Sequence, residues 1–162
     1  MKSAHALSAA VLLAALLPAP ASAQMDGFGI GIVAGDPTGL CLKNWLSQKS
    51  ALELAAAWSF EGDGGFFLAG DYVLHSFDIA DSGSGLDGLM FTYGLGGKLY
   101  FRDENENDDD GDVVLGVRIP LGLCYPFEGA PVDMFVQLAP VMDIVPDTEL
   151  GLNGGIGARL YF

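Results

Sequence analysis

The last eight residues of the chain, Gly155 to Phe162, alternate strictly between two sets of side chains and end on an aromatic residue. Successive side chains of a β-strand point to opposite faces, so this alternation predicts a strand. One face is wholly apolar, whereas the other carries Arg159. Because a lipid-facing barrel surface excludes charge and a barrel interior can hold it, this ending is typical of the strand that closes an outer-membrane β-barrel.

The N-terminus predicts export from the cytoplasm. Lys2 precedes an apolar run from Ala6 to Leu17, which is followed by two prolines and the small residues Ala21 to Ala23. This order is that of a secretory signal peptide cleaved after Ala23. The alternative, a membrane anchor, needs about 20 apolar residues, and this run has twelve. We therefore expect residues 1–23 to be removed and residues 24–162 to form a single barrel domain.

The composition combines strong acidity with strong apolarity. The formal net charge is −14, and 51% of the residues are hydrophobic. The negative charge excludes nucleic acid as a partner, since its phosphates would be repelled. No long apolar run of the kind that forms a transmembrane helix follows the N-terminal segment, so a helical membrane protein is excluded as well.

Alternation with period two, interrupted by clusters of Gly, Pro, Asp and Asn, predicts eight strands. Their ranges are 28–34, 39–46, 51–60, 66–77, 89–101, 113–127, 133–145 and 153–162. Eight is the smallest common strand number of a transmembrane barrel. The predicted fold class is therefore all-β, an eight-stranded antiparallel up-and-down transmembrane β-barrel with short loops. Pro120, Pro126 and Pro140 lie inside these ranges and cannot donate a ladder hydrogen bond, so we expect β-bulges there.

The charges of the predicted strands all fall on one parity. The opposite parity is uncharged and mostly apolar, as at Leu54, Leu68 and Val117. The charged parity holds, together with many glycines, Lys43, Glu53, Asp71, His75, Lys98, Arg118, Gln137, Asp143 and Arg159. A soluble β-sandwich or lipocalin-like barrel would show the same alternation with its apolar face turned inward.

Three features favour the membrane version over the soluble one. The charged face is rich in glycine, which suits a narrow, crowded lumen better than a solvated surface. Aromatic residues cluster near both ends of the strands, as the two interfacial girdles of a membrane barrel require. Tyr161 and Phe162 resemble the C-terminal signal that the outer-membrane assembly machinery reads. Trp45 falls on the charged parity of a short strand, and we place it at the periplasmic rim.

The inward charges predict a network within the lumen. Its predicted members are Lys43, Glu53, Asp71, Lys98, Arg118, Asp143 and Arg159. Lys43 and Glu53 face each other across a short turn. Four other charges are expected at similar heights on four consecutive predicted strands, in the order acid, base, base, acid: Asp71, Lys98, Arg118 and Asp143. Buried charges are tolerated when they are paired, and an eight-stranded barrel is normally filled by side chains, so we favour a plugged lumen. The alternative is a narrow channel for ions or small solutes.

The segment from Arg102 to Asp112 carries seven carboxylates in eleven residues and is an outward loop by topology. A weak cation site there would use Asp108, Asp109, Asp110 and Asp112. However, an EF-hand register with Gly111 at position six places Val117 where a glutamate is needed. We therefore predict no dedicated metal site and prefer a solvated loop that charge repulsion keeps extended.

Catalysis has few candidates. His75 is the only histidine after the predicted cleavage site, and Ser76 falls on the opposite face, whereas lipid-modifying barrels that use both residues place them on one face. We predict no catalytic residue and no cofactor, and a lipid A-modifying enzyme is the third hypothesis. Cys41 and Cys124 are expected near opposite ends of the barrel, too far apart for a disulfide, so we predict two free thiols.

Three runs of sequence carry a resemblance to a family. They are Phe28 to Leu40, Phe101-Arg-Asp with the acidic tract and Gly116 to Gly122, and Val145 to Phe162. The runs resemble a family of small outer-membrane proteins of spirochaetes and other Gram-negative-type bacteria, thought to form eight-stranded barrels of the OmpA/OmpX type. The Asp-Pro-Thr-Gly-Leu and Pro-Asp-Thr-Glu segments are the more specific parts. The resemblance implies a fold and a location, and no established activity comes with it.

The sequence therefore predicts a non-enzymatic protein of the bacterial outer membrane with a structural or surface-interaction role. Its expected partners are outer-membrane lipid, lipopolysaccharide and the outer-membrane assembly machinery. A monomer is favoured.

Overall fold

The computed structural model describes residues 27–59, 65–76, 88–102 and 113–162. The regular elements of these residues are the strands β1 (Phe28–Asp36), β2 (Gly39–Trp45), β3 (Ser50–Ser59), β4 (Gly65–Ser76), β5 (Met90–Arg102), β6 (Val113–Arg118), β7 (Leu121–Pro126), β8 (Val132–Val145) and β9 (Glu149–Tyr161). Within the described ranges no helix is long and apolar enough to cross a membrane. The predicted signal peptide, and the acidic segment with Asp108, Asp109, Asp110 and Asp112, lie outside them.

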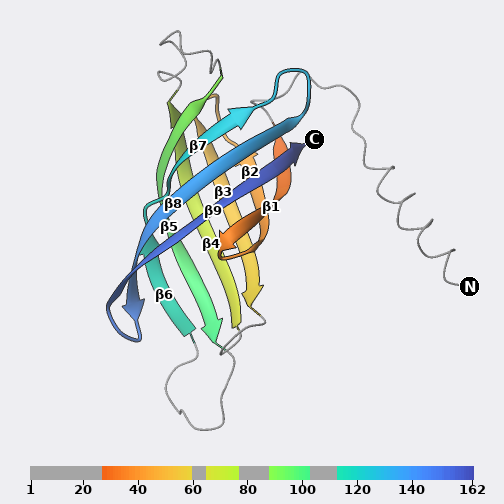
Figure 1. Ribbon diagram of the computed structural model, residues 1–162. Helices are drawn as coiled ribbons and strands as arrows, with labels where there is room; N and C mark the ends of the chain where they lie inside the picture. Colours follow the sequence, from red (N-terminus) through yellow and green to blue (C-terminus); the bar gives the residue numbers. More distant parts are fainter. Residues whose placement is uncertain (1–26, 60–64, 77–87, 103–112) are drawn as a thin grey trace, which may run out of the picture.

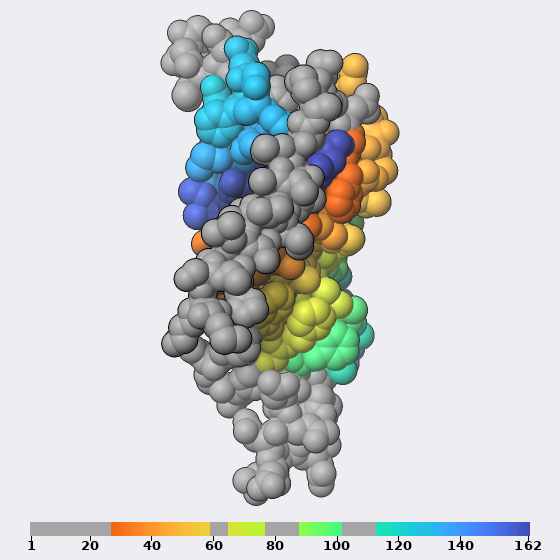
Figure 2. Space-filling model, turned by 90° about the vertical axis from the view of Figure 1, so that its right-hand side faces the viewer, coloured from red at the N-terminus to blue at the C-terminus, as the bar shows by residue number. Residues whose placement is uncertain are grey.

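Antiparallel pairing joins the strands into a closed ring (Figure 1). The last strand returns to the first, with Tyr161 of β9 opposite Gly29 of β1, and Figure 2 shows the C-terminal residues in blue beside β1 in orange. The strands β6 and β7 share one place in the ring, since both pair with β5 and with β8. The ring therefore has eight places, and the predicted eight-stranded antiparallel barrel is confirmed.

The two ends of the barrel differ in the turns that they carry. The turns β1–β2 and β8–β9 belong to the same end of the barrel, the one that faces downward in Figure 1, which we call the outer end. The turns β2–β3 and β7–β8 lie at the opposite end together with the C-terminus, and we call it the inner end.

The barrel is apolar outside and charged inside. Ile32 and Leu54 expose 66% and 52% of their surface, whereas Arg118 and Arg159 expose 4% and 3%. The parity that we predicted to face outward is thus the exposed one, and the charged parity is enclosed by the ring. A soluble barrel would have the reverse arrangement, because its apolar side chains would form the core. The structure therefore lacks the inward apolar face that the soluble alternative requires.

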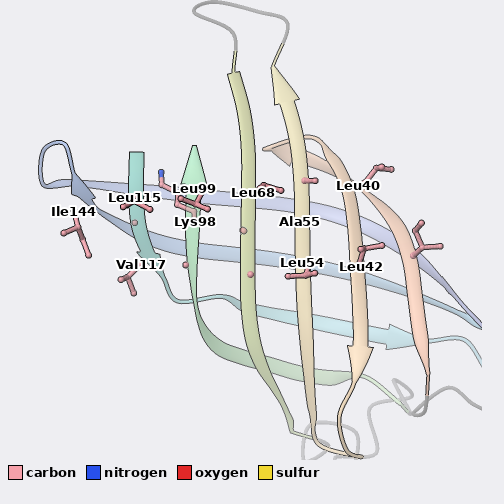
Figure 3. Close-up of a pocket in the computed structure, with 16 residues that line it drawn as sticks. Leu40, Leu42, Leu54, Ala55, Leu68, Lys98, Leu99, Leu115, Val117 and Ile144 are labelled. Atoms are coloured by element: carbon pink, nitrogen blue, oxygen red, sulfur yellow. The ribbon is translucent and has the colours of Figure 1, made fainter. Parts of the chain in front are cut away.

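The outer wall carries a shallow apolar hollow of about 920 Å³ (Figure 3). Figure 3 shows that its lining crosses several strands, with Leu54 on β3, Leu68 on β4 and Leu99 on β5. Between them Gly70 of β4 lies opposite Gly97 of β5. A Cβ added to Gly97 would meet nothing closer than 3.5 Å. The hollow therefore follows from two neighbouring outward positions that lack side chains.

The predicted sixth strand is interrupted between Arg118, where β6 ends, and Leu121, where β7 begins. Pro120 is buried and has no N–H to donate, so regular pairing stops there. The register nevertheless continues, since Gly96 of β5 lies opposite Arg118 and Tyr93 of β5 lies opposite Leu121. The two segments are one strand with a gap, and the predicted bulge at Pro120 is wrong.

The bulges predicted at the other two prolines are wrong as well. Pro126 pairs opposite Asp133 and Pro140 opposite Leu152 without a change of register. The register shift in this region lies between Leu115 and Gly116 on β6. Pro126 is the last residue of β7, and Pro140 lies within β8. In both places the strand keeps its pairing although the proline has no N–H to donate, so no extra residue is inserted.

Candidate functional site

Arg118 of β6 and Asp71 of β4 form an ion pair that crosses the strand between them. The Nε of Arg118 lies 3.3 Å from the Oδ1 of Asp71, and both side chains are buried. Gly96 of β5 lies opposite both residues in the register. A Cβ on Gly96 would collide with the Asp71 carboxylate and with the backbone of Gly70. The absence of a side chain at Gly96 therefore creates the space in which the arginine meets the carboxylate.

A second ion pair follows the same rule nearer the outer end. The Nζ of Lys98 on β5 lies 2.9 Å from the Oδ1 of Asp143 on β8. Gly116 of β6 lies between them in the register, and a Cβ there would lie 2.5 Å from the Asp143 carboxylate. We call Lys98–Asp143 and Arg118–Asp71 the outer pairs. They explain two of the glycines on the charged parity.

Arg159 is the centre of a larger group that lies nearer the inner end than the outer pairs do. Its Nη1 donates to Glu53 Oε1 at 2.8 Å, and its Nε donates to Asp133 Oδ1 at 3.0 Å. The hydroxyl of Tyr161 donates to the other Asp133 oxygen at 2.5 Å. The ring of Phe135 lies 4.1 Å from the guanidinium carbon. Glu53 is on β3 and Arg159 is on β9, and these strands are not neighbours. The two side chains that form the Arg159–Glu53 hydrogen bond therefore reach across the lumen and fill it.

Lys43 completes the same group at the inner end. Its Nζ lies 3.3 Å from Glu53 Oε1 and 2.7 Å from His75 Nε2. The ammonium also lies 4.3 Å from the centre of the Trp45 ring, and the centre of that ring lies 4.3 Å from the centre of the His75 ring, with the two rings tilted by 43°. Lys43 is 0% exposed. We call Lys43, Glu53, Asp133, Arg159 and Tyr161 the inner cluster.

Gln137 of β8 joins the inner cluster to the outer pairs. Its Oε1 accepts from Arg118 Nη2 at 3.0 Å, and its Nε2 donates to Glu53 Oε2 at 3.4 Å. The ion-paired side chains of the described strands comprise four cations, Lys43, Lys98, Arg118 and Arg159, and four carboxylates, Glu53, Asp71, Asp133 and Asp143. The described network is therefore electrically balanced, which is the condition under which buried charge is tolerated.

The structure places all seven predicted network residues inside the barrel. The four that we expected at similar heights form two separate pairs. Lys43 lies opposite Glu53, as the turn between their strands requires. The sequence reasoning missed Asp133, which is 2% exposed, because it stands at the start of a predicted strand. Its parity, shared with Gln137 and Asp143, was the signal that could have identified it.

Two aromatic residues also take part in the lumen. Tyr161, assigned from the sequence to an assembly signal, is 3% exposed and bonds to Asp133. Phe162, its neighbour, points outward and is 45% exposed. Trp45 is 7% exposed and faces the lumen at the inner end, so its parity was a better guide than its position near the rim.

Cys41 and Cys124 are free and buried. Their predicted separation to opposite ends of the barrel is wrong, however, because both belong to one buried cluster with Met90 and Phe135. Strands of a barrel are tilted, so residues near opposite ends of distant strands can reach the same depth. Cys124 also lies 3.2 Å from Asp133 Oδ2 through its Sγ.

Within the described ranges there is no group of three or more His, Cys, Asp or Glu side chains that could hold a metal ion. The ring of His75 contacts the Lys43 ammonium and the Trp45 indole, and the described residues place no serine or cysteine hydrogen bond on it.

Comparison with known proteins supports the fold. No protein-family model matches the chain, and no curated protein matches it. Among solved structures, the chain has the fold of the N-terminal β-barrel domain of OprF from Pseudomonas aeruginosa. The TM-score is 0.59 and the sequence identity is 18%, with 85% of this chain and 98% of that domain covered. At this identity the likeness establishes the barrel fold.

Proposed function

We propose that this chain is a non-enzymatic β-barrel protein of the bacterial outer membrane, with a structural or surface-interaction role and a lumen plugged by side chains. One observation carries the proposal. Apolar side chains are exposed around the ring, while every ion-paired side chain of the described strands is turned inward.

The outer wall supports a membrane location. Exposed leucines, isoleucines and valines occur between β1 and β9, and they include Leu95 of β5, Leu138 of β8 and Leu152 of β9, at 61%, 55% and 60% exposure. Monomeric soluble proteins rarely expose an apolar patch larger than about 300–600 Å². A bilayer removes this cost, because it supplies hydrocarbon to an apolar band around the barrel. The predicted signal peptide agrees with this compartment.

The inner cluster and the outer pairs support a plug. The cavity near Arg118 and Gln137 has a volume of only about 30 Å³. On its inner side, Arg159 spans from β9 to Glu53 on β3, and Lys43 is fully buried against Trp45 and His75. An ion passing through the lumen would have to separate several buried ion pairs. Each buried side-chain charge left without its partner costs several kcal/mol.

The C-terminal residue and the outer end support the proposed partners. Phe162 is exposed on the outer wall, where the outer-membrane assembly machinery could read it. The exposed carboxylates Asp147 and Glu149 lie at the outer end, where cations could bridge them to lipopolysaccharide phosphates. We also propose that the chain is related to the small outer-membrane proteins of spirochaetes and other Gram-negative-type bacteria, which the segment from Asp36 to Leu40 resembles. We propose that the barrel is a monomer.

Electrophoretic mobility and cell fractionation test the location. A closed barrel in the outer membrane should sediment with that fraction, and an unboiled sample should migrate at a different apparent mass from a boiled one. The boiled sample of the same preparation is the control. Recovery of the protein in the soluble periplasmic fraction, with identical mobility before and after boiling, would overturn the proposal.

A narrow channel is the second candidate, because a cavity of about 820 Å³ lies on the outer side of the plug. Planar-bilayer recordings separate the two. A plugged barrel leaves the bilayer silent, whereas a channel gives unitary conductance that changes in Lys98→Ala and Asp71→Ala. Conductance in the unmodified protein would contradict the plug.

A further inference from the structure

The outer end of the lumen contains a cavity of about 820 Å³, which we call the outer vestibule. The β1–β2 turn, the outer ends of β3, β4 and β5, and Asn153 of β9 line it. Small-molecule sites are typically concave spaces of about 300–1,000 Å³ and often lie in the mouths of β-barrels. The outer vestibule has the size and the place of such a site. This inference rests on the proposed barrel and is independent of the plug.

The walls of the outer vestibule are aromatic and apolar on one side. Phe67 of β4 and Tyr100 of β5 line it and belong to one packed group with Ala57 of β3. Asn153 of β9 lines both the vestibule and the cavity of about 30 Å³ near Arg118 and Gln137 on its inner side. Its buried Oδ1 has no hydrogen-bond partner among the described residues. A mostly apolar wall with a few polar groups is what holds and orients a small ligand.

The charge of the outer vestibule is negative. Asp36 lines it and takes part in none of the five ion pairs of the described residues. Lys98, the cation of the lining, is already paired with Asp143 at 2.9 Å. The chain carries a net charge of −14. Asp36, Lys98 and the Asp143 carboxylate that pairs with Lys98 sum to one negative charge. A net negative charge in a cleft raises the local concentration of cations, so the vestibule favours cations over anions.

The kind of cation follows from the walls. A metal ion would need several oxygen, nitrogen or sulfur ligands, and the described residues contain no group of three acidic, histidine or cysteine side chains that could supply them. An organic ammonium instead uses aromatic faces, through cation–π attraction, together with a carboxylate as counter-ion. We propose that the outer vestibule binds a small organic cation, a primary or quaternary ammonium compound, between the Asp36 carboxylate and the rings of Tyr100 and Phe67.

Calorimetric titration of the full barrel in maltoside detergent tests this proposal. The probe is choline, and its uncharged isostere 3,3-dimethylbutanol is the matched ligand. Choline should bind, and the isostere should bind at least about tenfold more weakly, because it lacks the charge that the carboxylate and the ring faces attract. Asp36→Asn should weaken choline by a similar factor. The control Asp147→Asn removes an exposed carboxylate of the same end that does not line the cavity, and should leave the affinity nearly unchanged.

Substitutions at Lys98 and Tyr100 determine the sign of the ligand charge and the ring that contacts it. Lys98→Met should strengthen choline binding, since it releases the Asp143 carboxylate, whereas it would abolish binding of an anionic ligand. Tyr100→Leu should weaken binding, and Tyr100→Phe should restore it if the ring is the contact. Heat-modifiable mobility shows that each variant is folded. Equal affinity for choline and the isostere, no effect of Asp36→Asn, or no binding at millimolar choline would overturn the inference while leaving the barrel itself intact.

Discussion

Replacing Val117 with arginine tests which medium surrounds the outer wall. Val117 exposes 37% of its surface and lies opposite Gly97 of β5 and Met142 of β8. Val113, four residues earlier on the same face of β6, exposes 38%. The two valines therefore differ in depth along the barrel and hardly at all in exposure, so Val113→Arg is a matched control.

The expected difference follows from the geometry. Four residues of a strand cover about 13 Å, and a tilt of about 40° leaves about 10 Å along the barrel axis. The apolar band is about 25 Å tall, and an outward arginine costs about 2–4 kcal/mol at its middle and about 0–1 kcal/mol near its edge. We expect Val117→Arg to lower the free energy of unfolding by about 2–3 kcal/mol more than Val113→Arg, about 30- to 150-fold in the equilibrium constant.

Urea titration of the barrel refolded into phosphatidylcholine vesicles measures both free energies, with tryptophan fluorescence and gel mobility as independent probes. In water, arginine is tolerated at either exposed position. Equal losses in Val117→Arg and Val113→Arg, or no loss in either, would refute the assignment of the outer wall to lipid.

Three more predictions concern the lumen. Arg159→Met should cost about 3–5 kcal/mol in the same titration, because it strands the buried carboxylate of Asp133, and a loss no larger than that of Arg159→Lys would contradict the network. Gly96→Ala should destabilise the barrel by about 1–3 kcal/mol, because the added methyl group overpacks against Asp71. The control Gly97→Ala, at the adjacent outward position, should be neutral or should stabilise the barrel by about 0.4–1 kcal/mol. Equal effects of the two substitutions would show that the two glycines do not face opposite sides of the wall. The two cysteines should react with maleimide only after unfolding, since both are buried, and fast labelling of the folded barrel would show that water reaches their cluster.

The alternation of side chains predicted most of the fold and the facing of the network. Period two is a local property of the chain, so Lys43, Glu53 and Arg118 could be assigned to the interior without knowing their partners. The pairing across one short turn, Lys43 with Glu53, could also be predicted. The exact partners across other strands could not, because they depend on register and on glycines of the intervening strand, as at Gly96.

Strand ends and strand tilt account for the errors. Asp133 is the first residue of a predicted strand, where facing is least certain, and its pairing with Arg159 of β9 shows that its side chain belongs to the network. The shared cluster of Cys41 and Cys124 depends on the tilt of β2 against β7, which a single sequence does not specify. Pro120 interrupts a strand without changing its register, and a missing N–H alone does not distinguish a gap from a bulge.

Accessibility of nitroxide labels in bilayers tests the central claim most directly. Labels at Leu54, Leu68 and Leu99, on a background without the native cysteines, report the medium at the outer wall, and a label at Lys49 in the exposed β2–β3 turn serves as the aqueous reference. The account predicts that dissolved oxygen relaxes the three wall labels more strongly than a water-soluble nickel chelate does, with the reverse order at the turn. Stronger relaxation by the chelate at all four positions would show that water, and not hydrocarbon, surrounds the apolar wall.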